Sequence, residues 1–328
     1  MTKIKKVPIV TVLMPVLNGT SHINEAIDSI LNQSLRNFEL LIIDDGSEDT
    51  TVKKIGSYND SRIHLILNHK NIGQSKTLNK GLDMARGKYI ARMDQDDISM
   101  PNRLKKQVEF MEANSNVDVC GSWAKIAGDY DGVLELETES EMIKMNLLTN
   151  KNLVHPAVMI RRRTLIKNDL KYNPNFIVAN DYDLWVRMFN YCTFANLPEP
   201  LLEYRVHSDQ SSKLIIEKNI HETNKVLQIL LNKIGVQTND SSLLIYKKVF
   251  YGYGIETLQI SEVFKSLRKL RSSNIRNKTF DHYVFNEFII GKWRNFMIGN
   301  NHRLLYGVLT LLFFRPFTHF KKIGKLKN

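Results

Sequence analysis

The sequence predicts an α/β protein in which a mostly parallel sheet is flanked by helices and followed by a helical C-terminal region. Two observations predict the sheet: apolar, β-branched runs alternate with segments of helical period over the first hundred residues, and the connections are short. A third observation is the charge distribution. Residues 1–212 hold 26 Lys/Arg against 27 Asp/Glu, whereas residues 213–328 hold 20 against 7. We therefore expect an α/β domain over 1–212 and a basic helical region over 213–328.

Four strands and three intervening helices account for the first part of the chain. The strands are expected where apolar, β-branched residues run together, at 8–16, 38–45, 63–68 and 88–94. The helices are expected where apolar residues recur every three or four positions, at 21–34, 46–58 and 73–87. Alternation of this kind predicts parallel strands joined by crossover helices.

Further helices are expected after the first hundred residues. A helix is predicted over 100–114, with Pro101 suited to its first turn, and another after the acidic stretch at 180–183. Residues 215–235 and 240–274 also have helical periodicity. These segments supply most of the helical C-terminal region.

Composition limits the class of protein. With 328 residues and 43% apolar residues, the chain can build a substantial core. The two cysteines form neither a disulfide framework nor a zinc pattern, which is typical of a reducing compartment. Lysines followed by an apolar run imitate a signal peptide near the N-terminus, but Pro8 and Pro15 bracket that run, so we interpret it as a buried strand. We found no apolar stretch that reaches the roughly 20 residues of a membrane-spanning helix.

Aspartates follow two of the predicted strands directly. Residues 42–47 read IIDDGS and residues 92–97 read RMDQDD, and the loop after the first strand is also polar. Because the carboxyl ends of parallel strands meet at one edge of a sheet, these groups should converge there. Clustered carboxylates repel one another unless a cation offsets their charge, and oxygen ligands favour Mg²⁺ or Mn²⁺. The alternative is that DDGS forms an ordinary turn and that Asp97 caps the helix at 100–114.

Five segments resemble family 2 glycosyltransferases, the large inverting group with the GT-A fold. They are residues 10–19, 29–51, 71–108, 153–162 and 180–188, which read VTVLMPVLNG, SILNQSLRNFELLIIDDGSEDTT, NIGQSKTLNKGLDMARGKYIARMDQDDISMPNRLKKQV, LVHPAVMIRR and NDYDLWVRM. The match runs in order over about residues 7–210. The resemblance implies a hexosyltransferase that binds a nucleotide-sugar donor, normally a UDP-sugar, together with Mn²⁺ or Mg²⁺.

The resemblance also implies roles for individual donor-site residues. Pro15 and Leu17 would line the nucleoside pocket, and Asp45 would contact the uracil or the ribose. The sequence Asp-Gln-Asp stands where the family has its Asp-x-Asp motif. Asp96 would then be the metal ligand, and Asp94 would contact the ribose and the ion. A metal ion there would stabilise the charge that grows on the diphosphate leaving group.

Asp181 is the predicted catalytic base. An inverting transfer is a single displacement, so a base must accept the proton of the acceptor hydroxyl. The family has a Glu-Asp pair at this place, and here the pair reads Asn180–Asp181, which leaves the supporting role of position 180 in question. Asp183 lies two residues further along a helix and cannot face the same atom as Asp181. The alternative is an acidic first turn before an amphipathic helix, with Trp185 in the core.

Two histidines and an arginine complete the candidate site. His155, in LVHPAVMIRR, is either a donor or acceptor contact or a packed strand residue, and Trp185 is a further candidate contact. His207 follows Arg205 in a polar segment. Related enzymes supply a late histidine near the diphosphate, and neutral imidazole is an acceptable ligand for Mn²⁺. Arg205 would meet phosphate oxygens, and the alternative is a solvated polar loop.

The basic C-terminal tail predicts attachment to an anionic membrane surface. Residues 291–328 hold eight Lys/Arg and no acid, and the apolar run 304–314 is too short to span a bilayer. The alternative is a helix packed on the first domain. Because aromatic and aliphatic residues are dense here, lipid suits the tail better than nucleic acid, and no nucleic-acid partner is expected. We therefore expect a cytoplasmic protein, peripheral on the inner face of the cell membrane.

Three functions remain to be distinguished. The first is a transferase that moves one sugar to a lipid-linked saccharide in surface polysaccharide assembly. The second is a module that binds a nucleotide-sugar without turnover, supported by the departure at Asn180. The third is a nucleotidyltransferase, which would need a glycine-rich, basic loop after the first strand, and residues 15–24 hold one glycine and neither Lys nor Arg.

Overall fold

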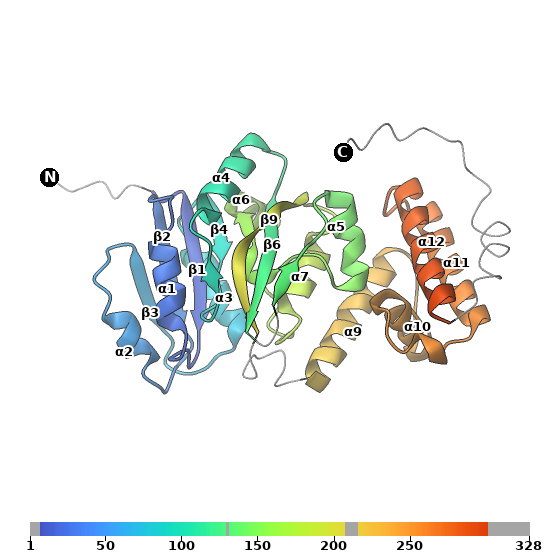
Figure 1. Cartoon of the computed structure of the whole chain (residues 1–328), viewed down its shortest axis with the longest axis horizontal. Helices are drawn as coiled ribbons and strands as arrows, with labels where there is room; N and C mark the ends of the chain where they lie inside the picture. Colours follow the sequence, from blue (N-terminus) through green and yellow to red (C-terminus); the bar gives the residue numbers. More distant parts are fainter. Residues whose placement is uncertain (1–6, 129–130, 207–215, 301–328) are drawn as a thin grey trace. The chain divides into compact units, whose positions relative to one another are not determined.

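The computed structural model describes residues 7–128, 131–206 and 216–300 and divides the chain into two compact units (Figure 1). The first unit is Met1–Val226 and the second is Leu227–Asn328. The boundary lies inside helix α9 (Ile216–Lys233), somewhat beyond the boundary at 212/213 that charge and periodicity suggest. The first half of α9 therefore belongs to the same unit as the sheet.

A nine-stranded sheet forms the centre of the first unit, in the order β3-β2-β1-β4-β8-β6-β9-β5, with β7 paired to β6. The strands are β1 (Val10–Val16), β2 (Phe38–Asp44), β3 (Ile63–Leu67), β4 (Tyr89–Arg92), β5 (Ile98–Ser99), β6 (Val119–Gly128), β7 (Gly132–Leu134), β8 (Met159–Arg161) and β9 (Phe194–Val206). Most paired positions lie in parallel ladders, which confirms the predicted α/β class.

Helices follow the strands in the predicted alternation. In the first unit they are α1 (Ile23–Leu31), α2 (Thr51–Gly56), α3 (Gln74–Met84), α4 (Arg103–Ala113), α5 (Ser140–Asn146), α6 (Arg162–Lys167) and α7 (Asn180–Met188), with short 3₁₀ turns η1 (Leu147–Thr149) and η2 (His155–Ala157). Every residue of β1 and β2 is buried, as expected for parallel strands that are covered on both faces. On α1 the buried stripe includes Ile23, Ile27 and Ile30, and burial of each such side chain contributes about 1.5–3 kcal/mol.

Antiparallel pairs appear in the second half of the sheet. β8 runs antiparallel to both β4 and β6, and the short β5 runs antiparallel to β9. In the β5–β9 ladder Ile98 lies opposite Glu203, so the acidic segment before β5 lies next to the end of β9. This pairing joins two segments about a hundred residues apart in sequence, and no local pattern predicts it.

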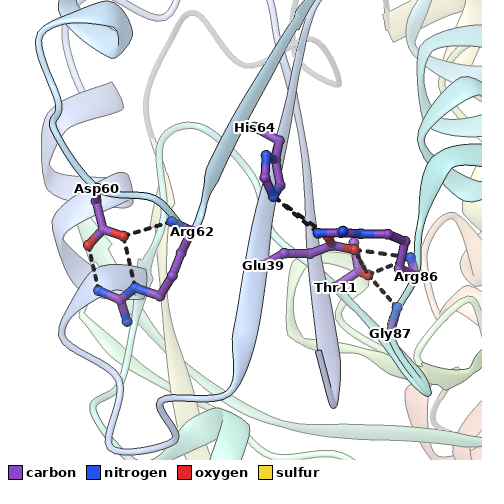
Figure 2. Close-up of polar contacts among 7 residues, drawn as sticks. All are labelled: Thr11, Glu39, Asp60, Arg62, His64, Arg86 and Gly87. Atoms are coloured by element: carbon purple, nitrogen blue, oxygen red, sulfur yellow. Dashed lines mark hydrogen bonds and ion pairs between the residues drawn. The ribbon is translucent and has the colours of Figure 1, made fainter. Parts of the chain in front are cut away.

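A buried carboxylate organises the sheet edge at the amino ends of β1 and β2 (Figure 2). Glu39 on β2 accepts hydrogen bonds from the Thr11 hydroxyl (2.6 Å) and from the backbone N–H (3.0 Å) and Nε (2.7 Å) of Arg86. The Thr11 hydroxyl in turn accepts the backbone N–H of Gly87 at 2.9 Å. His64 on β3 contacts the Arg86 guanidinium. These bonds fix the turn between α3 and β4.

The second unit is helical within the described residues. After the end of α9 it contains α10 (Asp240–Tyr251), the 3₁₀ turn η3 (Ile255–Thr257), α11 (Ile260–Asn277) and α12 (His282–Gly299). Local capping starts these helices: Asn239 and Ser242 form a capping box before α10, and the Asp281 carboxylate accepts the first N–H groups of α12. The core includes the stacked rings of Phe280 and Phe285. Among the described helices none has the length and hydropathy needed to cross a membrane.

Candidate active site

Hydrogen bonds join the loops that follow β1, β2 and β4. The side-chain amide of Gln95 accepts the Leu17 N–H at 2.8 Å and donates to the Leu17 carbonyl at 3.0 Å. The Asn18 N–H donates to the Ser47 hydroxyl at 2.9 Å, and the Asn18 side chain accepts the N–H of Glu48 at 3.0 Å. The expected convergence of these loops at one sheet edge is therefore present.

Asp45 is buried and orders the chain before α3. One carboxylate oxygen accepts the Ile72 N–H (3.0 Å) and the Asn68 side-chain amide (2.9 Å), and the other accepts the Gly73 N–H (2.9 Å). Gly73 has a φ of 91°, a conformation that favours glycine. Asp45 thus holds the start of α3, and its contact with the uracil or ribose stays a prediction.

The loop after β4 gathers three carboxylates. Ligand oxygens of Asp94, Asp96 and Asp97 all lie within 4.8 Å of one another. Arg92, which is buried at the end of β4, forms an ion pair of 2.6 Å with Asp94. Burial raises the pKa of Asp94 and, more strongly, that of Asp97, and the neighbouring carboxylates add to both rises. Such a cluster holds excess negative charge that a cation would offset.

Asp97 does not have the helix-capping role that the sequence allowed for it. It does not cap the helix at 100–114, because α4 starts at Arg103 with Asn102 at the cap position. One oxygen of Asp97 instead accepts the Arg205 N–H at 2.9 Å, and the other is buried with no hydrogen-bond partner in the described part of the chain. A buried carboxylate oxygen without a partner, beside two other carboxylates, fits a divalent cation.

Asp181 lies at the start of α7, in the same region as these acids. Burial raises its pKa to about 6, the Tyr182 N–H (2.7 Å) and the charge of Arg92 act to lower it, and the charge of Asp94 acts to raise it. The charges of Arg92 and Asp94 both act on the pKa of Asp181, and the preceding residue, Asn180, bonds the start of α3. A carboxylate with a pKa near neutrality is suited to accept a proton.

The neighbours of Asp181 have separate structural roles. Asn180 is buried, and its side-chain amide donates to the Gln74 side chain (3.1 Å) and the Ser75 hydroxyl (3.2 Å) at the start of α3. Asp183 is also buried and accepts Nε of Arg187 at 2.8 Å. As predicted, Asp183 serves a different partner from Asp181. The α3 N-terminus therefore contacts Asp45 on one side and Asn180 on the other.

An aromatic cluster is formed by His155, Tyr172 and Trp185, and Trp185 lies on the same helix as Asp181. His155 Nε2 is 2.8 Å from the Tyr172 hydroxyl, and burial lowers the pKa of His155 well below its usual value. The ring of His155 lies edge-on to Trp185, with centroids 6.1 Å apart. His155 is in the 3₁₀ turn η2 and not in a strand, which corrects the alternative interpretation of this residue. Trp185 is 1% exposed, as its core interpretation predicts.

Arg205 points toward α1 in this structure. Its guanidinium contacts Glu25 and His22, and this ion pair lowers the pKa of Glu25. A contact between Arg205 and a diphosphate stays a prediction. His207 lies outside the described residues.

Comparisons with known proteins identify the family. The model of glycosyl transferase family 2 matches residues 11–170. An uncharacterized glycosyltransferase of Haemophilus influenzae is 31% identical over 80% of this chain and 87% of its own length. The chain belongs to glycosyltransferase family 2. The O-antigen biosynthesis glycosyltransferase WbnJ of Escherichia coli is 32% identical over 62% of this chain and 82% of its own.

Solved structures support the fold of this family 2 glycosyltransferase. S. aureus TarS in complex with UDP-GlcNAc has a TM-score of 0.60 at 17% identity, covering 90% of this chain and 91% of TarS. The mannosyltransferase PcManGT from Pyrobaculum calidifontis, in complex with GDP-Man and Mn²⁺, has a TM-score of 0.55 at 14% identity, covering 93% and 87%. At these identities the likeness concerns the fold, and it confirms the predicted GT-A architecture.

The glycosyltransferase has site residues that sequence reasoning missed. Arg92 pairs with Asp94, Gln95 bridges to Leu17, and the Tyr172 hydroxyl bonds His155. A signal for Arg92 existed, because an arginine inside the apolar run KYIARM is unusual for a buried strand. Tyr172 has no comparable signal, because it lies in an irregular segment and only the tertiary structure brings its hydroxyl to His155.

Proposed function

We propose that this glycosyltransferase is an inverting, metal-dependent enzyme that moves a sugar from a UDP-sugar to a hydroxyl group of a saccharide. The observation that supports the proposal most is Asp181, a partly buried carboxyl with a pKa of about 6 on which the charges of Arg92 and Asp94 act, together with the three-carboxylate loop that contains Asp94. A base and a cation-binding cluster in one region match the two needs of a single displacement.

In the proposed reaction, Asp181 accepts a proton from the acceptor hydroxyl. The acceptor oxygen then forms a bond to the anomeric carbon while the bond from that carbon to the diphosphate oxygen breaks, and the electron pair leaves with UDP. Because attack and departure occur on opposite faces, the configuration at that carbon inverts. Partial burial raises the pKa of Asp181 to about 6, so the carboxylate is a stronger base than an ordinary aspartate and is still deprotonated near neutral pH.

Asp94, Asp96 and Asp97 are the residues that would hold Mn²⁺ or Mg²⁺. The cation would supply charge stabilisation for the departing diphosphate. Arg92 neutralises part of the cluster and holds Asp94 in place through their ion pair. Further contacts to the donor are assigned to Pro15, Leu17 and Asp45, with Arg205 and His207 near the diphosphate.

Replacement of the base tests this assignment most directly. UDP release would be measured with Mn²⁺ from UDP-galactose, UDP-glucose, UDP-N-acetylglucosamine and UDP-N-acetylgalactosamine, with and without chelator. We expect Asp181→Asn to lose about 10²–10⁴-fold in rate, the usual contribution of a positioned base, while UDP affinity stays near that of the wild type.

Asp183→Asn is the matched control, because Asp183 lies on the same helix but pairs with Arg187. It should keep most of the activity at a temperature where it is folded. Equal rates for Asp181→Asn and the wild type would refute the base assignment. Tight UDP binding without turnover by the wild type would instead favour a binding module.

The acceptor is proposed to be a lipid-linked saccharide of a cell-surface polysaccharide. The name of the relative WbnJ refers to O-antigen biosynthesis, and TarS was crystallised with UDP-GlcNAc, which supports a UDP-sugar donor. A panel of synthetic lipid-diphosphate saccharides, followed by mass analysis of the products, would test the class of acceptor. Transfer to water alone, with every acceptor of the panel, would count against it.

We further propose that the C-terminal region holds the enzyme on the anionic inner face of the cell membrane. Residues 213–328 hold 20 Lys/Arg against 7 Asp/Glu, and Lys265, Arg268, Lys269 and Arg276 are exposed on α11. Each basic residue near such a surface contributes about 1 kcal/mol. Removal of residues 300–328 should reduce cosedimentation with phosphatidylserine vesicles. If the protein with residues 300–328 present does not cosediment with these vesicles at low salt, the proposal is refuted.

A further inference from the structure

One carboxylate holds the chain that leads into the catalytic helix. Glu222 on α9 accepts three successive backbone N–H groups, from Ile177 (2.9 Å), Val178 (2.8 Å) and Ala179 (3.1 Å). Ala179 is the cap residue of α7, so Asp181 follows this contact directly. Glu222 is 3% exposed, and all of these residues lie in the first unit.

This contact anchors the segment just before α7, and it does not bond the N–H groups of the helix's own first turn, which a cap residue would accept. The first N–H groups of a helix have no partner inside the helix, and Ala179 has no side-chain acceptor to offer them. The Glu222 carboxylate instead accepts the N–H groups of the three residues before α7, and its negative charge is favourable at a helix N-terminus. Hydrogen bonds to an ionised acceptor are about twice as strong as neutral ones, so the backbone before Asp181 is firmly held.

Other bonds near the base are weaker constraints. Asn180 donates neutral bonds of 3.1 and 3.2 Å to α3, and the Asp181 carboxylate accepts the Tyr182 N–H of its own helix. None of these fixes the direction in which the chain enters α7. Glu222 alone among the described side chains bonds the consecutive N–H groups at 177–179.

We propose that Glu222 is a positioning residue for the base Asp181. It fixes the entry of α7 so that the Asp181 carboxyl faces the bound donor and acceptor, and it makes the first half of α9 part of the catalytic apparatus. The inference rests on the proposed role of Asp181. Because displacement of a reacting group by about 1 Å costs on the order of 10²-fold in rate, a loosened entry should lower kcat.

Glu222→Gln is the decisive variant, since glutamine has the same shape but presents an NH₂ group where one acceptor oxygen was. We expect kcat to fall roughly 10- to 100-fold, the usual effect of losing a supporting hydrogen-bond partner, while KM for the UDP-sugar and UDP affinity change little. Glu217→Gln, an exposed glutamate on the same helix, is the control and should match the wild type.

A double-variant cycle separates positioning from general stability. If Glu222 acts through Asp181, then Glu222→Gln should add little to the loss already caused by Asp181→Asn. Additive losses, an unchanged kcat in Glu222→Gln, or equal falls in kcat and UDP affinity would each overturn the proposal. If the wild type transfers no sugar while Mn²⁺ and UDP-sugars are present, the proposed function fails instead.

Amide hydrogen exchange gives a readout that needs no activity. In the wild type, the amides of residues 177–179 should be protected although they precede the helix, and in Glu222→Gln they should exchange about tenfold faster or more. Unprotected amides at 177–179 in the wild type would overturn the proposal, even where the variant fails to fold.

Discussion

The side-chain amide of Gln95 and the backbone of Leu17 form a reciprocal pair of hydrogen bonds, at 2.8 and 3.0 Å. Gln95 is the middle residue of the Asp-Gln-Asp motif, so a residue between two acids aligns the motif with the loop after β1. The motif's central position is thus a structural link and not a spacer. Gly19 lies beside it, where a Cβ would approach the Gln95 side-chain oxygen to 2.8 Å.

Replacement of Gln95 by alanine should weaken donor binding. Two lost hydrogen bonds are worth about 1–2 kcal/mol, which corresponds to roughly a 5- to 30-fold rise in the dissociation constant of UDP. Calorimetry with UDP and Mn²⁺ would measure it. Gln95→Glu keeps the acceptor for the Leu17 N–H and should lie between the wild type and alanine, whereas equal affinity in all three proteins would contradict the link.

Several features of this site were predictable because they depend on local pattern. Buried β-branched runs predicted β1 and β2, and polar residues placed after such runs predicted that the loops after β1, β2 and β4 would lie together, since the carboxyl ends of parallel strands share an edge. The β5–β9 pairing was not predictable, because two residues of strand carry no periodicity. The contact between Asp97 and the Arg205 N–H depends on that pairing, so it was missed as well.

Long-range contacts explain the other omissions. Glu222 lies on an amphipathic helix whose sequence gives no sign that one glutamate is buried against the N–H groups of residues 177–179. The departure from the family's Glu-Asp pair at Asn180 left the support for the base in question, and it gave no indication of where else the chain is held. The support at this helix entry comes from a residue more than forty positions later in the chain.

Loss of a single carboxylate from the acidic loop should weaken metal activation. Asp96→Asn is expected to raise the Mn²⁺ concentration for half-maximal activity by about tenfold or more, because a neutral amide is a poorer ligand for a hard cation. Asp60→Asn is the control, since Asp60 pairs with Arg62 just before β3 (Figure 2). That pair lies at the amino end of a parallel strand, whereas the acidic loop follows the carboxyl end of β4. Full activity of the wild type in excess chelator would refute a metal requirement.

The pH dependence of the enzyme should follow Asp181. Its pKa is raised to about 6, so the carboxyl is deprotonated and able to act as a base above that pH and becomes protonated below it. We expect kcat/KM to be flat near pH 7 to 8 and to fall tenfold per pH unit below about 6. The pH dependence of kcat/KM reports the pKa values of essential groups in the free enzyme, which here is the pKa of Asp181. An acid limb centred near 4, the ordinary value for aspartate, would contradict the effect of burial.

Arg92 should shift that limb in a defined direction. Its positive charge acts to lower the pKa of Asp181, so Arg92→Met should raise that pKa and move the acid limb to higher pH. Fluorescence-detected UDP titrations over the same pH range would show whether the pH dependence of UDP affinity shifts as well. A limb that moves to lower pH in Arg92→Met would show that the two side chains do not interact as the structure indicates.

The Glu39 network tests stability apart from catalysis. Burial alone would raise the pKa of Glu39, but hydrogen bonds from Arg86 and Thr11 outweigh it and lower the pKa. A carboxyl whose folded pKa is lowered contributes stability above its unfolded pKa and loses it as the pH falls through the folded value. Glu39→Gln should therefore destabilise the protein by about 2–3 kcal/mol at pH 7, less than a fully buried pair because Arg86 is partly exposed.

Glu112→Gln is the matched control for Glu39→Gln. Like Glu39, Glu112 accepts hydrogen bonds from a basic side chain and a hydroxyl group, here those of Lys88 and Tyr89, but Glu112 is exposed. It should cost about 0.5 kcal/mol or less. Chemical denaturation at pH 7 and again below pH 4 would show the difference between Glu39→Gln and the wild type shrinking as carboxylates become protonated. Since this network lies at the amino ends of the strands, UDP affinity should not change. A loss of UDP affinity without a loss of stability would contradict the separation between the network and the acidic loop.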